Sequence, residues 1–161
     1  MTPEPVAATI LPVEPGYRHV LRLSAALFWG PLFIGSLVVN YLVLRDTPVF
    51  GLPPIIVGLI AFSAILIGPE RIYRRLGYAV DGGLLRVVRG WLFHSDTIVP
   101  FVRVQHIDVN RGPFDKLFGT ATLVVHTAGT HNSIVSLPGL SPDTAAAIRD
   151  DIRGSIRTDF E

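Results

Sequence analysis

Two long uncharged runs dominate the hydrophobic pattern in the first half of the chain. Residues 23–44 and residues 48–68 are mostly apolar, and only Arg45-Asp46-Thr47 lies between them. A helix of about 20 apolar residues crosses the hydrocarbon core of a bilayer, and a helix satisfies its own backbone hydrogen bonds there. The pattern predicts a transmembrane helical hairpin over residues 23–68. The alternative, two buried helices of a soluble core, would need more surrounding mass than so small a chain provides.

A few residues inside the predicted spans suggest how the helices pack. Asn40 is the one amide in either span, and it bonds to a partner helix or reaches water at the outer interface. Gly58, Ala61 and Ala64 form a stripe of small residues that serves packing within the hairpin or oligomerisation. Neither span contains Asp, Glu, Lys, Arg or His, which argues against ion-coupled transport by this chain alone.

The segments that flank the spans predict the orientation. Residues 1–22 contain four prolines without a helical or strand period, and we expect a flexible cytoplasmic tail there. Arginines gather on the side that the two termini share, whereas the loop between the spans holds Arg45 alone. Because positive charge stays inside, we expect an inner-membrane protein with two spans and cytoplasmic N- and C-termini. The membrane-flanking arginines are Arg18, Arg22, Arg71, Arg74 and Arg75.

After Gly68 the pattern changes to short alternating segments typical of β-strands. The sequence Asp81-Gly82-Gly83 is a tight-turn signal, a bulge is expected at Gly90, and Pro100 suggests an edge or a bend. Strands are expected at 77–80, 84–93, 96–102, 104–111, 121–127 and 133–137, with a helical turn at 113–117. A final helix over 142–157 starts at Ser141-Pro142 and places Ala145, Ile148, Ile152 and Ile156 on one face.

The fold class expected for residues 70–161 is a mainly-β domain of about six or seven antiparallel strands capped by a C-terminal α-helix. That order of elements is the layout of a pleckstrin-homology-like (PH-like) barrel, although other small barrels fit the same pattern. The net charge of +1 argues against a nucleic-acid partner. The chain has no cysteine, which removes disulfides and thiolate chemistry.

The pattern resembles the YdbS-like family of bacterial PH-domain membrane proteins. This resemblance implies a cytoplasmic PH-like fold on a membrane anchor, and it gives no catalytic residues to carry over. The residues that carry it are Asp81-Gly82-Gly83-Leu84, Ile98-Val99-Pro100, Arg103-Val104-Gln105-His106-Ile107, Gly112 to Gly119, Ala121 to Gly129 and Leu137-Pro138-Gly139-Leu140.

Chemical signatures are scarce. The chain has no phosphate-binding glycine loop, no dinucleotide fingerprint and no G-x-S-x-G motif. His126 and His131 flank one predicted turn but lack a third metal ligand at a defined spacing. Asp108 and Asp115 are separated by a turn, which argues against paired-carboxylate catalysis. We therefore expect no enzymatic activity, no cofactor, no metal and no small-molecule substrate.

Basic residues of the soluble part are candidates for contact with lipid head groups or a partner: Arg86, Arg89, Arg103, Arg111 and Lys116. Phosphoinositide-binding PH domains resemble one another in carrying basic residues around the first hairpin loop. In this chain the loop is the acidic 81–83, and residues 71–161 hold 11 Lys and Arg against 9 Asp and Glu. Scattered solvated charge is the competing interpretation.

Protein binding is the other hypothesis. The edge predicted at Pro100 could accept a strand, and Phe114, Leu117 and Phe118 form either a core plug or an exposed contact surface. We expect a membrane-anchored, non-enzymatic scaffold or subunit of a membrane protein assembly; the alternative is a membrane protein that senses anionic lipid. The expected partners are the lipid bilayer and a membrane protein or a second copy of the chain.

Overall fold

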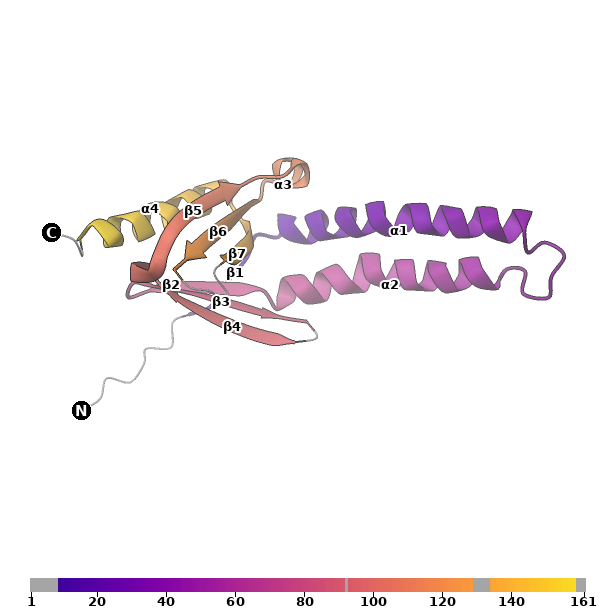
Figure 1. Cartoon of the computed structure of the whole chain (residues 1–161), viewed down its shortest axis with the longest axis horizontal. Coiled ribbons are helices and arrows are strands. Elements are labelled where there is room, and N and C mark those ends of the chain that lie inside the picture. The colour runs from indigo at the N-terminus through magenta and orange to yellow at the C-terminus, as the bar shows by residue number, and fades with distance from the viewer. Residues whose placement is uncertain (1–8, 92, 129–133, 159–161) are drawn as a thin grey trace. The chain divides into compact units, whose positions relative to one another are not determined.

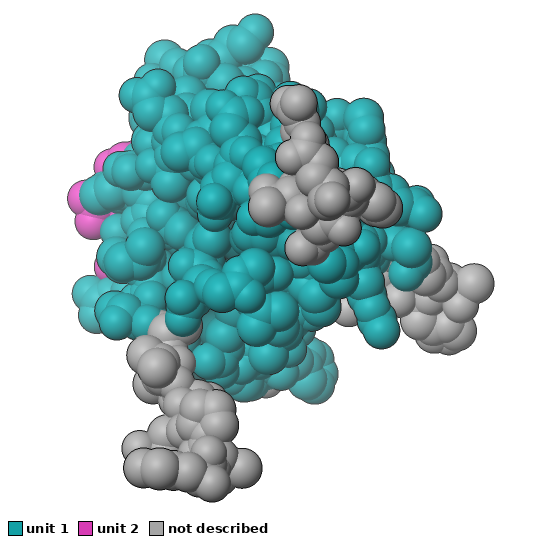
Figure 2. Space-filling view, turned by 90° about the vertical axis from the view of Figure 1, so that its left-hand side faces the viewer, with its two compact units in different colours: residues 1–17, 72–161 teal, residues 18–71 magenta. Residues whose placement is uncertain are grey.

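The chain divides into two compact units, one of residues 1–17 with 72–161 and one of residues 18–71 (Figure 2). The computed structural model describes residues 9–91, 93–128 and 134–158, with side chains as far as Ser155. The predicted positions of His131 and Ile156, and the turn around residues 129–133, lie outside that description. Each unit has its own set of contacts.

Two helices form the apolar part of the chain and lie side by side (Figure 1). Helix α1 spans Gly16–Leu42 and helix α2 spans Leu52–Arg74, and both are long and apolar enough to cross a membrane. The helices continue past the outer ends of the predicted spans, since α1 begins at Gly16 and α2 ends at Arg74, and they stop short on the loop side, at Leu42 and Leu52. Hydropathy marks the apolar window, whereas backbone hydrogen bonds extend a helix into polar flanking residues.

Contacts inside residues 18–71 hold the two helices together. The Asn40 side chain is 7% exposed, and its Oδ1 accepts a 2.7 Å hydrogen bond from the Gly51 N–H just before α2. Of the two alternatives for Asn40, this burial favours the hydrogen-bonding one, with the backbone just before α2 as the partner. A Cβ added to Gly58 would lie 3.1 Å from Cε2 of Phe33 in α1, and Ala61 is buried, so these two residues of the small-residue stripe pack within the hairpin.

Two antiparallel sheets and a C-terminal helix make up the other unit. The first sheet has the order β1-β2-β3-β4 and the second β5-β6-β7. The predicted β-rich order with a closing helix is confirmed, although the strands form two sheets rather than one closed barrel. The elements are β1 (Leu11–Pro12), β2 (Gly77–Asp81), β3 (Leu84–Gly90), β4 (His94–Pro100), the 3-10 turn η1 (Phe101–Arg103), β5 (Val104–Asn110), α3 (Pro113–Phe118), β6 (Ala121–Thr127), β7 (Ile134–Leu140) and α4 (Pro142–Thr158).

The described part of the N-terminal segment pairs with the sheet, so the prediction of a flexible tail is wrong for residues 9–22. Leu11 pairs with Tyr78, Val13 is 3% exposed, and the N–H of Glu14 donates to the carbonyl of Gly139 at 2.7 Å. A strand of two residues has no period to detect in the sequence. Pro12 is tolerated because an edge strand does not need every backbone N–H.

The β3–β4 connection also differs from the prediction. Strand β3 ends at Gly90, which pairs with His94 at the start of β4. The expected bulge at Gly90 and the continuation of the strand to Phe93 are both replaced by a turn. Trp91 and Phe93 therefore lie between two strands instead of extending one.

A single hydrophobic core lies between the sheets and α4, whose contacts are with η1, β5 and β6 (Figure 1). Ala145, Ile148 and Ile152 of α4 are all buried, which confirms that the predicted apolar stripe faces the sheets. Inward-facing positions alternate along the strands, as a two-residue period requires. The largest fully buried side chains are Leu85, Val87, Thr120, Leu123, Val125, Leu137, Leu140 and Ile152.

Helix α3 is not a core plug. None of its residues is buried, and Leu117 is 68% exposed. The Asp115 carboxylate shapes the segment, because it accepts hydrogen bonds from the Gly112 N–H at 3.0 Å and from the Thr120 hydroxyl at 2.6 Å. The polar network, rather than apolar burial, therefore fixes this turn.

Candidate functional site

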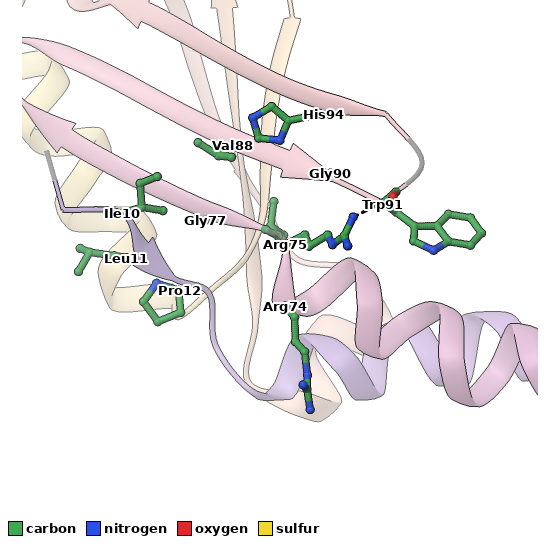
Figure 3. Close-up of a pocket in the computed structure, with 11 residues that line it drawn as sticks. Ile10, Leu11, Pro12, Arg74, Arg75, Gly77, Val88, Gly90, Trp91 and His94 are labelled. Atoms are coloured by element: carbon green, nitrogen blue, oxygen red, sulfur yellow. Dashed lines mark hydrogen bonds between the residues drawn. The ribbon is translucent and has the colours of Figure 1, made fainter. Parts of the chain in front are cut away.

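An open groove of about 560 Å³ lies where α2 gives way to β2. Ile10, Leu11 and Pro12 line one side, and Trp91 and His94 lie across from them (Figure 3). Arg74 and Arg75, at the end of α2, contribute to the lining. We call this feature the exit groove.

The exit groove is cationic. Nη1 of Arg75 donates a hydrogen bond to the carbonyl of Trp91 at 3.2 Å, which ties the end of α2 to the β3–β4 turn (Figure 3). Arg74 points away from Arg75 in the same view. No carboxylate occurs among the described residues that line the groove, so its electrostatic preference is for anions.

The β3–β4 turn presents two aromatic side chains to solvent. Trp91 is 50% exposed and Phe93 is 83% exposed; we call this pair the aromatic tip. A second cavity, of about 260 Å³, is lined by both residues together with Tyr17 and Ile72. Tyr17, in the first turn of α1, and Ile72, in the last turn of α2, belong to the same compact unit as the aromatic tip.

Strand β4 forms the open edge of the first sheet among the strands that the structure describes. Ile98 on this strand is 56% exposed, while its neighbour Val99 points inward and is 4% exposed. The Pro100 prediction is thereby confirmed, since β4 is an edge strand and ends at Pro100. Val102, in the following turn, is 71% exposed. The edge therefore carries apolar side chains beside an unpaired strand.

Arg86 and Asp96 form an ion pair across β3 and β4. The guanidinium of Arg86 donates to both carboxylate oxygens of Asp96, with Nε at 2.9 Å and 3.1 Å from them. These hydrogen bonds lower the pKa of the Asp96 carboxyl and raise the pKa of Arg86. The Arg86 cation is thus already matched by an anion of its own chain.

The other candidate basic residues are distributed over the surface. Arg89 lies three positions after Arg86 on β3 and borders the cavity at the aromatic tip. Arg103 is in η1 at the far end of β4, and Arg111 and Lys116 belong to the segment between β5 and β6. Side chains an odd number of positions apart leave opposite faces of a strand, so Arg86 and Arg89 do not share a face.

The two aspartates considered as a catalytic pair, Asp108 and Asp115, belong to different sets of contacts. Asp108 lies between two histidines, with one carboxylate oxygen 2.9 Å from Nε2 of His106 and the other 3.6 Å from Nε2 of His126. Asp115 belongs to the network of α3. Within the part of the chain that the structure describes, no group of three or more His, Cys, Asp or Glu residues could hold a metal ion.

Neither the exit groove nor the aromatic tip was predicted from the sequence. The groove assembles residues from segments that are far apart in the chain, and no local motif marks it. A signal for the tip does exist, because Trp91-Leu92-Phe93 is followed directly by the polar residues His94-Ser95-Asp96. Alternation fails at that point, and a failure of the two-residue period marks a turn.

Comparison with known proteins gives the family. The model of the family described as "Bacterial PH domain" matches residues 16–156. The chain is 34% identical over 88 residues to the "UPF0699 transmembrane protein YdbS" of Bacillus subtilis (strain 168), a match that covers 55% of this chain and 54% of that relative. The chain thus spans about half the length of this curated relative, and no solved structure matches it. Two membrane-length helices, the β-rich unit with its closing helix and the family match together show that the chain belongs to the bacterial PH domain family.

Proposed function

We propose that this chain is a non-enzymatic membrane-anchored module that binds a protein partner as a scaffold or subunit of a membrane assembly. The observation that carries the proposal is the open β4 edge with its exposed apolar side chains. A strand at a sheet edge has backbone N–H and C=O groups that can pair with an incoming strand. The partner surface that fits is therefore an extended apolar segment of another membrane protein.

The neighbouring side chains support this site. Ile98 lies opposite Arg86 in the register, and Leu84, which is 43% exposed, lies opposite Pro100. An added strand would gain affinity from main-chain hydrogen bonds and specificity from contacts with alternate side chains. Arg86 and Asp96 form an ion pair beside Ile98, so neither side chain would present an uncompensated charge to an added strand.

Introducing a charge at the edge tests the proposal. The unsubstituted full chain, purified in mild detergent, is expected to retain a stoichiometric membrane-protein partner. The Ile98→Lys variant should retain at least about ten-fold less of that partner than the unsubstituted chain, because a lysine on an edge strand blocks strand addition. Ile134→Lys is the matched control, since Ile134 is 57% exposed on β7. Quantitative mass spectrometry of the purified complex gives the readout. Equal recovery by the two variants, or no partner with the unsubstituted chain, contradicts the proposal.

We further propose that α1 and α2 cross the inner membrane as a hairpin with both termini in the cytoplasm. Support comes from the five arginines that flank the predicted spans, residues 23–44 and 48–68, on the shared side, against Arg45 alone in the loop. A reporter that is active only in the cytosol should work when fused after Glu161 and fail when inserted in the 45–47 loop. The reverse pattern would overturn this topology.

A further inference from the structure

The β3–β4 turn has an unusual composition for an exposed turn. Turns are normally built from Gly, Pro, Asn, Asp and Ser, whereas the sequence at this turn is Trp91-Leu92-Phe93. The two described side chains of the triplet, the aromatic tip, are 50% and 83% exposed. An exposed apolar group of this kind marks an interaction site, and the chemistry around it indicates what it contacts.

The position of the aromatic tip is defined by contacts within its own unit. Arg75, the residue that directly follows α2, donates its hydrogen bond to the Trp91 carbonyl. Trp91 and Phe93 share a cavity with Tyr17 and Ile72, which belong to the terminal turns of α1 and α2. If the two helices span the bilayer, Tyr17 and Ile72 lie next to the points where the chain enters and leaves it, and the aromatic tip shares their cavity.

The charges around the aromatic tip match a bilayer surface. Arg75 lines the exit groove beside Trp91, and Arg89 lines the second cavity. No carboxylate occurs among the described residues that line either cavity. Tryptophan settles at the head-group level of membranes, and arginines close to the surface are attracted to anionic lipids.

We propose that the aromatic tip inserts into the head-group region of an anionic leaflet of the bilayer that α1 and α2 cross. This inference rests on the proposed membrane anchoring and is independent of a protein partner at β4. Insertion gives the PH-like unit a third attachment to the membrane besides the two helices. The unit would then be held in a fixed orientation, with the aromatic tip at the bilayer and the far end of β4 away from it.

Tryptophan fluorescence of the full chain in lipid nanodiscs tests the inference. The chain has two tryptophans, Trp29 and Trp91, so Trp29→Phe leaves Trp91 as the reporter. In phosphatidylcholine–phosphatidylglycerol discs we expect about two-fold quenching of its emission by lipids brominated near the head group, because the indole would lie at that depth. We also expect protection from acrylamide in water.

Two control variants make the result interpretable. Trp91→Phe leaves Trp29, in the middle of α1, which lipids brominated deep in the acyl chains should quench if the helices span the membrane. Val102→Trp, made in a chain that lacks both tryptophans, reports on the far end of β4, where Val102 is 71% exposed. Its emission should respond to acrylamide and not to brominated lipid.

The outcomes separate this inference from the proposed anchoring. Quenching of Trp29 without quenching of Trp91 overturns insertion and leaves the anchoring intact, whereas loss of both signals overturns the anchoring. Protection of Trp91 from acrylamide without quenching by brominated lipid assigns the aromatic tip to a protein contact and also overturns insertion. Equal quenching of Trp91 in discs of phosphatidylcholine alone overturns the assignment of an anionic leaflet.

Discussion

Replacing Leu123 by alanine is expected to lower the free energy of unfolding of the PH-like unit by about 2–5 kcal/mol. Leu123 lies on β6, the central strand of the second sheet, and its side chain is fully buried. The substitution removes apolar burial and leaves a cavity that close-packed neighbours fill only in part. Hydrogen exchange of the β6 amides in the full chain, followed against denaturant in detergent, measures the change.

Leu117→Ala is the matched control for this prediction. It makes the same chemical change at a side chain that is 68% exposed on α3, so we expect a change in unfolding free energy within about 0.5 kcal/mol. The two variants differ only in the burial of the leucine that is removed. Equal destabilisation by both would show that β6 does not hold the core.

The core could be predicted because its strands carry a strong two-residue period. Along β6, Ala121, Leu123 and Val125 are each 0% exposed while the residues between them are partly exposed. A pattern of this kind fixes both the element and the face that packs inward. The closing helix was predictable for the same reason, with a period of 3.6 and an N-cap at Ser141 whose hydroxyl accepts the Thr144 N–H at 3.1 Å.

The candidate sites could not be predicted in the same way, because contacts between distant segments create them. The exit groove needs the N-terminal strand, the end of α2 and the β3–β4 turn in one place. Arg86 was a candidate for ligand contact until the register placed Asp96 within hydrogen-bonding distance. The sequence shows that Leu117 is apolar but not whether it is buried, because a helix of six residues is too short to display a hydrophobic period.

The N-terminal segment shows how a weak local signal can still have a large structural role. Its backbone bonds to Gly139 through Glu14, and Tyr17 packs directly against the Cα of Gly139. Tyr17 lies two residues after Pro15, at the start of α1. This contact, made within the PH-like unit, therefore attaches Tyr17 to β7, and it depends on the absence of a side chain at residue 139.

Gly139→Ala should break that attachment. Gly139 has φ of +79°, and an added Cβ would lie 2.7 Å from Cγ and 2.9 Å from Cβ of Tyr17. The left-handed backbone alone costs about 1–3 kcal/mol for a residue with a side chain, and the clash adds to it. We expect lower stability of the PH-like unit and faster hydrogen exchange in residues 11–17. Exchange mass spectrometry of the full chain in detergent measures both.

Gly154→Ala makes the same substitution at a position where we expect the stability of the PH-like unit to rise instead of fall. Gly154 lies inside α4, and an added Cβ would meet no atom within 4 Å. Alanine is favoured over glycine in a helix by about 1 kcal/mol, so this variant should be slightly more stable than the unsubstituted chain. If Gly139→Ala matched it in stability and in the exchange of residues 11–17, Tyr17 would not be packed against Gly139 of β7.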